Sequence, residues 1–506
     1  MGALVGVASG AVALGVAHLV AALDSRASSP IVAVGSAAID IAPEWLKSFA
    51  IRTFGVQDKL VLLVGIGAVV AALAVVLGVA SLRRPRIGLA GLTLLGAAGV
   101  LAALSRPDAT GASALPAIAG ASAGAATLLA LHRRLVPAAT DGRTEPTQAL
   151  EPVDRRRFLV ASGVAIVVAG AAAGFGQLLS RRREADASRA AVTLPDPAEA
   201  APPSPGGAEL GVDGLSPYFT PNEEFYRVDT ALIVPAVPAE DWSLRVHGMV
   251  ERELTMSFDE LAARPLIERD ITLACVSNEV GGPYVGNARW VGASLAGLLG
   301  EAGVDPAATQ LVSTSADGFT CGTPVAAVTD GRDAMLAISM NGEPLPIEHG
   351  FPVRMVVPGL YGYVSATKWV VDLELTTFEA FDPYWIRRGW AEMAPIKTQS
   401  RIDTPRQGAS VPAGDLTAAG VAWAQHVGIE RVEVRIDEGA WQEAELAVEG
   451  TIDTWRQWKL VAPIGAGEHR LQVRATDAGD EVQTDALAEP FPDGATGWHT
   501  VAIQAG

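Results

Sequence analysis

The sequence predicts a multi-domain protein with an N-terminal five-helix transmembrane region, a mixed α/β domain and a C-terminal immunoglobulin-like β-sandwich. Three observations support this. Residues 1–183 consist mainly of Ala, Gly, Val and Leu and hold few acids. Residues 184–506 have the composition of a soluble protein and carry most of the net charge of -18. Short alternating segments with Gly and Asp turns recur through 396–506, which is typical of an antiparallel sandwich.

Five stretches of the N-terminal region are long and apolar enough to cross a bilayer, which takes roughly 20 residues. Gly and Ala are abundant in all of them, as expected where membrane helices pack closely. Five buried helices within 180 residues of a soluble protein would need a very large core to cover them, so we predict membrane spans. The predicted spans are about 2–22, 59–81, 87–105, 112–132 and 158–180.

Basic residues predict the orientation of these spans. Arginines gather at 83–86 and at 133–157, and basic loops face the cytoplasm. With the N-terminus inside, five crossings place residues 181–506 outside, so we expect a multi-pass protein of the cell membrane with an extracytoplasmic soluble part. The arginines at 181–183 oppose this orientation, because they follow the fifth span on the outer side.

The run Arg155-Arg156-Arg157-Phe158-Leu159 precedes the predicted fifth span. Two interpretations fit it. It resembles a twin-arginine export signal, which would suit a domain that folds around a cofactor before it crosses the membrane. It is also what the positive-inside rule alone would place in a cytoplasmic loop.

The soluble part begins with a predicted linker, 184–215, whose Ala, Pro, Gly and acidic residues cannot build a core. A mixed α/β domain follows at 216–392, with strands such as Trp242–Val246 and Val353–Val357 and helices such as 258–263 and Leu295–Ala302. The predicted sandwich, 396–506, includes strands at Arg431–Ile436 and His469–Ala475.

Charge and cysteine content exclude several classes of function. An acidic soluble region is a poor partner for nucleic acid, whose phosphates need clustered Lys and Arg. The two cysteines, Cys275 and Cys321, cannot form a four-cysteine zinc site or an iron–sulfur cluster. One disulfide between them is compatible with the sequence, unless one thiol binds a metal.

The segment Ile271–Leu299 holds the most informative candidate residue. Thr272-Leu273-Ala274 predicts the end of a strand, and Cys275 stands where that strand opens into a loop rich in Gly and Asn. A thiol at such an edge can ligate a soft metal. From position alone, a buried free cysteine is the more common outcome.

Three blocks, in order along the chain, resemble the sulfite-oxidase family of molybdenum enzymes. The first is Thr272–Cys275 (TLAC) with Ala288–Gly292 (ARWVG); the second is Met340–Pro346 (MNGEPLP), His349–Arg354 (HGFPVR) and Val357–Gly359 (VPG); the third is Lys368-Trp369. The β-rich tail, with Trp423, Trp455 and Trp458, resembles that family's dimerisation domain. The resemblance covers about 215–506 and implies an α/β oxidoreductase domain that binds a molybdenum–molybdopterin cofactor.

The resemblance also implies roles for individual residues. Cys275 is the expected catalytic thiolate and metal ligand. The other expected cofactor contacts are Tyr226, Arg227, His349, Arg354, Ser365, Ala366, Thr367 and Lys368. The basic ones would hold the phosphate end of the pterin, and 365–367 would form the adjoining turn. The alternatives are a surface salt bridge for Arg354 and Lys368, a core histidine for His349, and simple packing for Tyr226.

The sequence departs from the family in its membrane helices and in its substrate region. There is no haem domain like that of animal sulfite oxidases, and only His18 and His132 lie in or near the helices, so a stack of bis-histidine haems cannot be built. In animal and plant sulfite oxidases a tyrosine approaches the metal, and here Cys321 takes about that place. The stretch 313–324 holds no Arg or Lys but contains Asp317, which disfavours a sulfite dianion.

We therefore expect a membrane-anchored oxidoreductase acting by oxygen-atom transfer, or a related two-electron reaction, on a small and uncharged substrate such as a sulfoxide. Its partners would be the membrane, a small-molecule substrate, and an electron donor or acceptor that is a quinone, a cytochrome or a redox subunit. The tail allows a homodimer. The alternatives are a true sulfite oxidase and a non-catalytic ectodomain that binds a protein.

Overall fold

The computed structural model describes residues 1–21, 30–43, 46, 49–50, 53–54, 58–106, 109–135 and 175–506. Within these residues the chain forms two compact units. The first is Met1–Arg183 with Thr230–Val234, and the second is Glu184–Asp229 with Pro235–Gly506.

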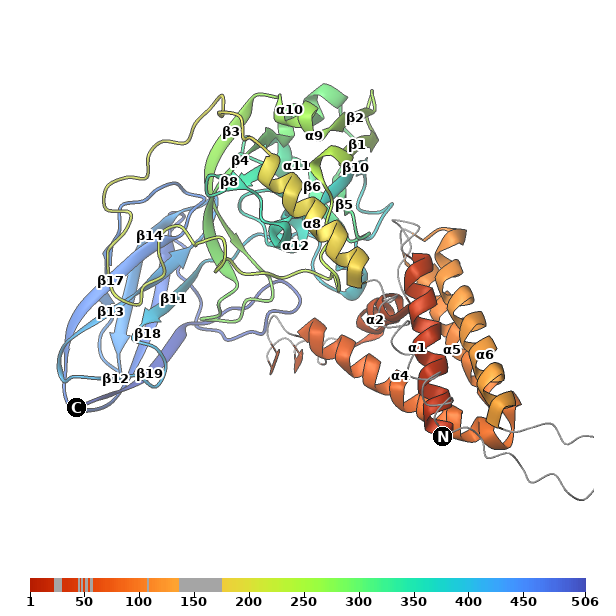
Figure 1. Ribbon diagram of the computed structural model, residues 1–506. Helices are drawn as coiled ribbons and strands as arrows, with labels where there is room; N and C mark the ends of the chain where they lie inside the picture. The colour runs from red at the N-terminus through yellow and green to blue at the C-terminus, as the bar shows by residue number, and fades with distance from the viewer. Residues whose placement is uncertain are drawn as a thin grey trace, which may run out of the picture. The chain divides into compact units, whose positions relative to one another are not determined.

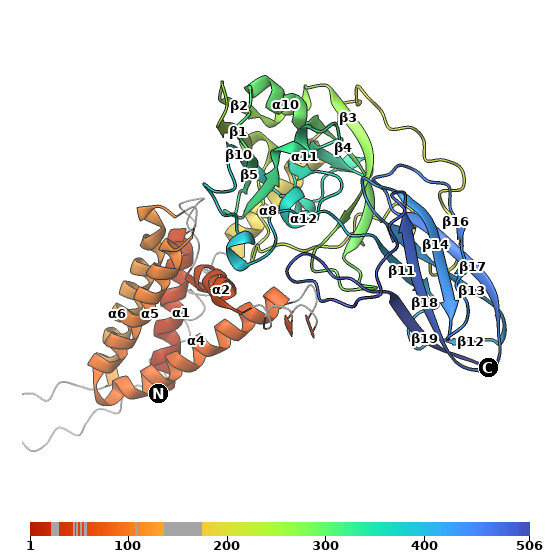
Figure 2. The ribbon, with the colours of Figure 1, turned by 180° about the vertical axis from the view of Figure 1, so that it is seen from behind.

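Four helices of the first unit are long and apolar enough to cross a membrane. Gly6 faces Ala74 and Gly78 so closely that a Cβ atom would meet the opposite backbone, which lets the first two long helices pack tightly. A shorter apolar helix, α2 (Pro30–Ile41), was not predicted; its 12 residues reach about 18 Å, less than a bilayer core. The long helices are α1 (Gly2–Ala21), α4 (Asp58–Arg83), α5 (Pro85–Leu104) and α6 (Leu115–Leu135), with η2 (Gly111–Ala114) before the last (Figures 1 and 2).

The predicted fifth span is about 158–180, and its residues 158–174 lie outside the described part of the chain. From Phe175 the chain is helical to Ala191 (α8), so the first residues of the predicted linker, 184–191, continue a helix. The physical reason is that 181–191 consists mostly of strong helix formers, Arg, Ala and Glu. Two anchors add to this: Ser188 donates to Glu240 at 2.6 Å, and Arg189 donates to the carbonyl oxygen of Pro344 at 2.8 Å.

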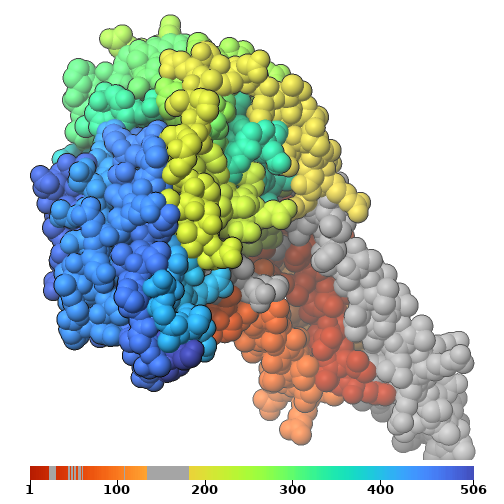
Figure 3. Space-filling model, turned by 90° about the vertical axis from the view of Figure 1, so that its left-hand side faces the viewer, coloured from red at the N-terminus to blue at the C-terminus, as the bar shows by residue number. Residues whose placement is uncertain are grey.

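The segment after Ala191 is extended but not free. It runs along both the α/β region and the C-terminal β region, as the yellow and yellow-green atoms in Figure 3 show. Gly207 accepts a hydrogen bond from the backbone of Val448, and the backbone of Leu210 donates to Gln457 at 2.7 Å. A segment without a core of its own is thus fixed by hydrogen bonds to the C-terminal β region.

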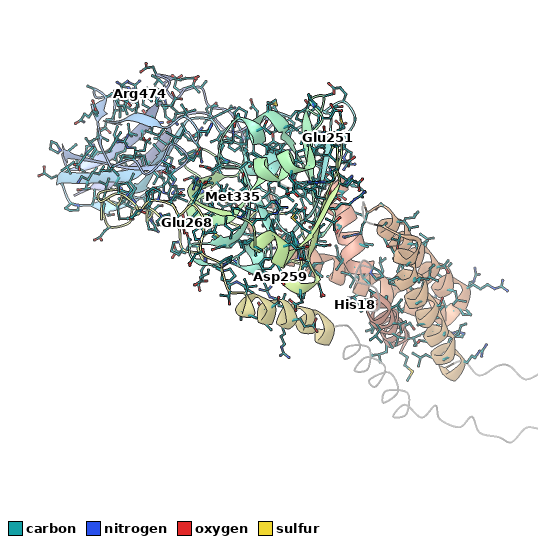
Figure 4. All side chains as sticks on the ribbon, turned by 90° about the horizontal axis from the view of Figure 1, so that it is seen from above. His18, Glu251, Asp259, Glu268, Met335 and Arg474 are labelled. Atoms are coloured by element: carbon teal, nitrogen blue, oxygen red, sulfur yellow. The ribbon has the colours of Figure 1, made fainter. Side chains whose placement is uncertain are left out.

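The α/β region of the second unit contains two sheets. The first has the order β2 (Leu254–Ser257), β1 (Ser243–Gly248), β10 (Val370–Thr376), β5 (Gln310–Ser315), β6 (Thr320–Pro324), in which only β1 and β10 are parallel. The second has the order β3 (Leu266–Ala274), β4 (Val285–Ser294), β7 (Met335–Met340), β8 (Glu343–Pro344), with β9 (Arg354–Val356) also paired to β7. All six residues of β7 are buried, and Met335 at its start lies inside the domain (Figure 4).

Short helices connect these strands. Ser257 and Glu260 form a capping box at the start of α9, and α10 ends at Gly303, which has the left-handed φ of 69° that glycine adopts readily. The helices are α9 (Phe258–Ala262), α10 (Leu295–Ala302), α11 (Val325–Thr329) and α12 (Gly362–Ser365), with η3 (Ala239–Asp241), η4 (Ile347–His349) and η5 (Ile386–Arg388).

The C-terminal region consists of two sheets that share one hydrophobic core, which is consistent with a sandwich. Trp458 and Leu416 come from one sheet, and Val432, Leu471 and Val501 from the other. The first sheet is β11 (Gln399–Thr404), β13 (Gly414–Trp423), β17 (Arg456–Ile464), β16 (Glu445–Leu446); the second is β12 (Ser410–Val411), β19 (His499–Ala505), β18 (Gly467–Asp477), β14 (Ile429–Ile436), β15 (Gln442–Glu443).

Candidate functional site

Cys275 opens the loop of the β3–β4 hairpin, as its sequence context predicts. β3 ends at Ala274, and the backbone N–H of Cys275 donates to Tyr284 at 2.9 Å, while Asn278 donates back to Cys275 at 3.0 Å. The thiol is 9% exposed. Burial raises the pKa of Cys275, while hydrogen bonds from Ser277 and the charge of Lys368 lower it. Metal binding at Cys275 would require loss of the thiol proton, which burial disfavours.

The strand that leads to Cys275 is held by the C-terminal sandwich. The backbone N–H of Thr272 donates to Asp453 at 2.9 Å, and its hydroxyl accepts from the backbone of Trp455 at 2.8 Å. Gln425 donates to the carbonyl oxygen of Thr272 at 3.2 Å. Three sandwich residues thus fix a backbone position three residues before Cys275.

The loop that follows Cys275 is held from the same domain. Arg401 donates to the carbonyl oxygen of Gly282 at 3.0 Å. Gly281 has a φ of 76°, and the imidazole ring of His499 occupies the space that a Cβ atom at Gly281 would need. The sandwich therefore supports both sides of the cysteine.

Arg354 is a buried cation without a carboxylate partner among the residues that the structure describes. It donates to the carbonyl oxygens of His349 and Ala366 at 3.2 and 3.3 Å, and its guanidinium lies 5.0 Å from the ring of Trp290. Its Nε has no hydrogen-bond partner there. Burial lowers the pKa of Arg354 to about 10. A buried guanidinium that lacks a carboxylate and is only partly hydrogen-bonded favours the binding of an anion.

Lys368 lies next to Arg354: a Cβ atom on Gly350 would be 3.0 Å from Arg354 Cβ and 3.1 Å from Lys368 Cβ. Its ammonium donates to Asp229 at 2.7 Å, and Arg227 donates to the same carboxylate oxygen at 2.8 Å. Burial lowers the pKa of Lys368 to about 8 even though Asp229 acts to raise it. The carboxylate of Asp229 therefore pairs with both Arg227 and Lys368, whereas the neighbouring Arg354 has no carboxylate partner among the described residues.

His349 and Tyr226 flank the ring of Phe225, which stacks on Tyr226 at 5.3 Å and meets His349 edge-on at 5.6 Å. His349 donates from Nε2 to the carbonyl oxygen of Asn222 at 3.1 Å. Burial and the nearby Arg354 and Lys368 lower the pKa of His349 to about 4, so the ring is neutral near pH 7. Burial also raises the pKa of Tyr226, which keeps its hydroxyl protonated.

The predicted turn, Ser365 to Thr367, follows α12 and precedes Lys368. The Ser365 hydroxyl donates to the carbonyl oxygen of Leu360 at 2.9 Å, and the Thr367 hydroxyl is 2.7 Å from that of Ser313. Both hydroxyls are therefore engaged within the domain. Their hydrogens are therefore not available as donors to a ligand in this arrangement, and backbone groups of 365–367 are the remaining donors.

Cys321 is fully buried in β6. Burial raises the pKa of its thiol, and hydrogen bonds with Thr367 and Ser313 lower it. Both cysteines are free thiols, so they form no disulfide. Within the described residues no three His, Cys, Asp or Glu side chains gather to hold a metal ion by themselves. A metal at Cys275 would need ligands from a cofactor.

A family model described as "Oxidoreductase molybdopterin binding domain" matches residues 231–385. The mitochondrial sulfite oxidase of Homo sapiens is 33% identical over 325 residues, covering 54% of this chain and 58% of that protein. The sulfite oxidase of Gallus gallus is 32% identical over 320 residues, covering 54% of this chain and 69% of that protein. The chain belongs to the sulfite oxidase-like family of molybdopterin-binding oxidoreductases.

Among solved structures, the sulfane dehydrogenase SoxCD from Paracoccus pantotrophus has 26% sequence identity and a TM-score of 0.49, covering 57% of this chain and 81% of that chain. The matched region spans 58% to 62% of the human and mouse sulfite oxidases. Membership in the family implies a molybdenum cofactor bound by the α/β region.

The residues present fit such a cofactor. A terminal phosphate would supply the anion that Arg354 lacks, and Lys368 lies on the same side of Gly350. The buried thiol of Cys275 would supply the soft ligand. The Tyr226 hydroxyl lies near the cysteine loop, because a Cβ atom on Gly362 would be 3.9 Å from that hydroxyl and 3.7 Å from the carbonyl oxygen of Ala274, the residue before Cys275.

Three residues of this site were not predicted. Asp229 is the shared counter-ion, Trp290 lies under Arg354, and Tyr361 is buried within electrostatic range of Cys275. Asp229 follows Arg227 by two positions, and this spacing was the one signal available. Trp290 was noted only as part of the ARWVG block.

We expect Arg354→Lys to lower molybdopterin content several-fold, because a lysine cannot reproduce the two-pronged contact of a guanidinium with phosphate. The measurement is pterin and molybdenum per purified chain. Arg245→Lys is the control, because Arg245 is half-exposed and pairs with Glu253 on the surface. Cofactor content equal to wild type in Arg354→Lys would remove Arg354 from the site.

Gly281→Ala should also lower cofactor content, because its methyl group would push on His499 and shift the loop that carries Cys275. Gly408→Ala is a matched control: its φ of 75° imposes the same backbone strain, but no atom lies within 4 Å of the added methyl group. We expect a clear loss of bound molybdenum for Gly281→Ala and little for Gly408→Ala. Equal effects of the two changes would show that strain alone acts.

Proposed function

We propose that this chain is a membrane-anchored, extracytoplasmic molybdenum oxidoreductase that transfers an oxygen atom, or performs related two-electron chemistry, on a small uncharged substrate. The single observation that carries the proposal concerns the β3–β4 hairpin, which carries the nearly buried Cys275. Trp290 of this hairpin lies under Arg354, a buried guanidinium that has no carboxylate partner among the described residues and lies next to Lys368. A sulfur-containing substrate such as a sulfoxide fits best.

The cofactor would supply the change of oxidation state, and the protein would hold and orient it. Cys275 would provide the thiolate ligand. Arg354 and Lys368 would bind the phosphate end, and His349, neutral and fixed by Asn222, would add a donor or a packing surface. Tyr226 stays protonated beside Gly362, where its hydroxyl can donate a hydrogen bond.

The charges around the site favour an uncharged substrate over sulfite. Arg289 and Arg332 are the two arginines best able to compensate for the missing cations of 313–324. Arg289 donates to both oxygens of Asp270 at 2.7 and 2.9 Å, and Arg332 is bound to Asp330 at 2.7 Å. Each is neutralised by its own carboxylate, so neither is free to bind a dianion.

Sulfite oxidation is the second candidate, favoured by the names and the 32–33% identity of the animal relatives. A non-catalytic ectodomain is disfavoured, because a protein-binding module has no need of a buried guanidinium without a counter-ion.

Four apolar helices support anchoring in the cell membrane. The basic loops at 83–86 and 133–157 favour a cytoplasmic N-terminus, and five crossings would then put 181–506 outside. The β-rich tail is compatible with a homodimer. The electron donor or acceptor would be a quinone, a cytochrome or a redox subunit.

Cys275→Ser should abolish turnover and change the electron paramagnetic resonance signal of the metal, because an alkoxide or water replaces a soft thiolate. Circular dichroism should stay close to wild type, since the hairpin backbone is held by the sandwich. Full activity in this variant would contradict the assignment of Cys275 as the metal ligand.

The substrate is tested by steady-state assays of the holoenzyme with methyl sulfoxides and with sulfite. We expect sulfoxide reduction to exceed sulfite oxidation in kcat/KM by at least tenfold. Sulfite turnover at a kcat/KM on the order of 10⁴ M⁻¹s⁻¹ or more would overturn the preference for an uncharged substrate.

Reporter fusions test the orientation. An alkaline phosphatase or fluorescent protein fused at residue 140 should report the cytoplasm, and one fused at the C-terminus should report the outside. If both report the cytoplasm, the proposed topology is wrong.

A further inference from the structure

The helical unit contains an apolar cavity of about 180 Å³ between α1, α2, α4, α5 and α6. These helices lie together in both ribbon views (Figures 1 and 2). Among the residues that the structure describes, the lining holds no charged side chain, and Ser9 is its one polar side chain. A charged ligand or a phospholipid headgroup would therefore be strongly disfavoured inside it.

Ser9 lies in the middle of α1 and is 1% exposed. Its hydroxyl has no hydrogen-bond partner in the part of the chain that the structure describes. Other hydroxyls in the same helices are satisfied: Ser81 donates to Gly78 at 2.8 Å, and Thr127 donates to Ala123 at 2.9 Å. A buried hydroxyl without a partner is destabilising, and an acceptor oxygen on a ligand would supply the partner that Ser9 lacks.

We propose that this cavity binds an isoprenoid quinone, with one quinone carbonyl accepting a hydrogen bond from Ser9. The required ligand is neutral, mostly apolar and equipped with at least one acceptor oxygen, and it must reach the site from the bilayer. The choice of a quinone among such molecules rests on the proposed oxidoreductase function, because a quinone is a two-electron carrier dissolved in the membrane. Binding itself does not depend on the molybdenum site.

Small residues provide the space for a flat ring. Gly10 and Gly96 lie along the lining, and Val70 projects from α4 into it. Enlarging Val70 should fill the cavity. Its neighbour Val69 is 60% exposed and is not part of the lining, so the same change there alters the helix without altering the cavity.

The test is isothermal titration of decylubiquinone into the full-length protein in lipid nanodiscs. We expect about one site per chain. Val70→Phe should lower affinity by more than tenfold, and Val69→Phe should change it by less than twofold. Ser9→Ala should lower affinity about fivefold to tenfold, as loss of one neutral hydrogen bond does, whereas Ser81→Ala should leave it unchanged.

Ser9→Ala also separates a ligand contact from a structural role. Without quinone, its thermal midpoint should equal or exceed that of wild type, because a buried unpaired hydroxyl is removed. A lower midpoint with unchanged affinity would make Ser9 a structural residue and overturn the proposal.

Two further measurements identify the ligand that the cavity binds. A dioleoylglycerol competitor that displaces decylubiquinone at equal concentration would show a lipid site instead of a quinone site. Absence of binding in wild type would overturn the proposal as well. Molybdenum and pterin are measured on the same samples, so quinone binding without metal would contradict the proposed function alone.

Discussion

The burial of Arg354 and Lys368 is the constraint on which the site depends, because only Lys368 has a carboxylate partner among the described residues. Arg227 and Lys368 share Asp229, and Arg354 has only carbonyl oxygens and the face of Trp290. Burying a charge without full compensation is costly, which is why the pKa values of Arg354 and Lys368 fall. An anionic cofactor would relieve this cost, so its binding and the stability of the α/β region should be linked.

The cysteine depends on a second set of contacts that come from another domain. Thr272 is bound by the backbone of Asp453 and Trp455, and Gly281 packs against His499. Burial and the charge of Arg401 lower the pKa of His499 to about 4, so this ring is neutral and acts by shape. The C-terminal β region thus supports the loop that carries the candidate metal ligand.

The sequence predicted local features well and long-range pairings poorly. The end of β3 at Ala274 and the helix Leu295–Ala302 were confirmed, because each is set by nearby residues, hydrophobic pattern and caps. The helical start of the linker was missed although Arg, Ala and Glu at 181–191 favour a helix. The anchors of Arg189 at the carbonyl oxygens of Pro344 and Leu345 lie far along the chain, where no local pattern reveals them. The pairing of Lys368 with Asp229 and of Arg289 with Asp270 depends on tertiary packing in the same way. Arg332, in contrast, pairs with Asp330 only two positions before it.

The contact between Gly281 and His499 has a consequence for the making of the protein. His499 begins β19, far downstream of the hairpin, so a ribosome completes the Cys275 loop long before it makes the residue that packs against it. Until then the loop lacks the packing contact that His499 provides. The surroundings of Cys275 are therefore complete only once β19 has been made.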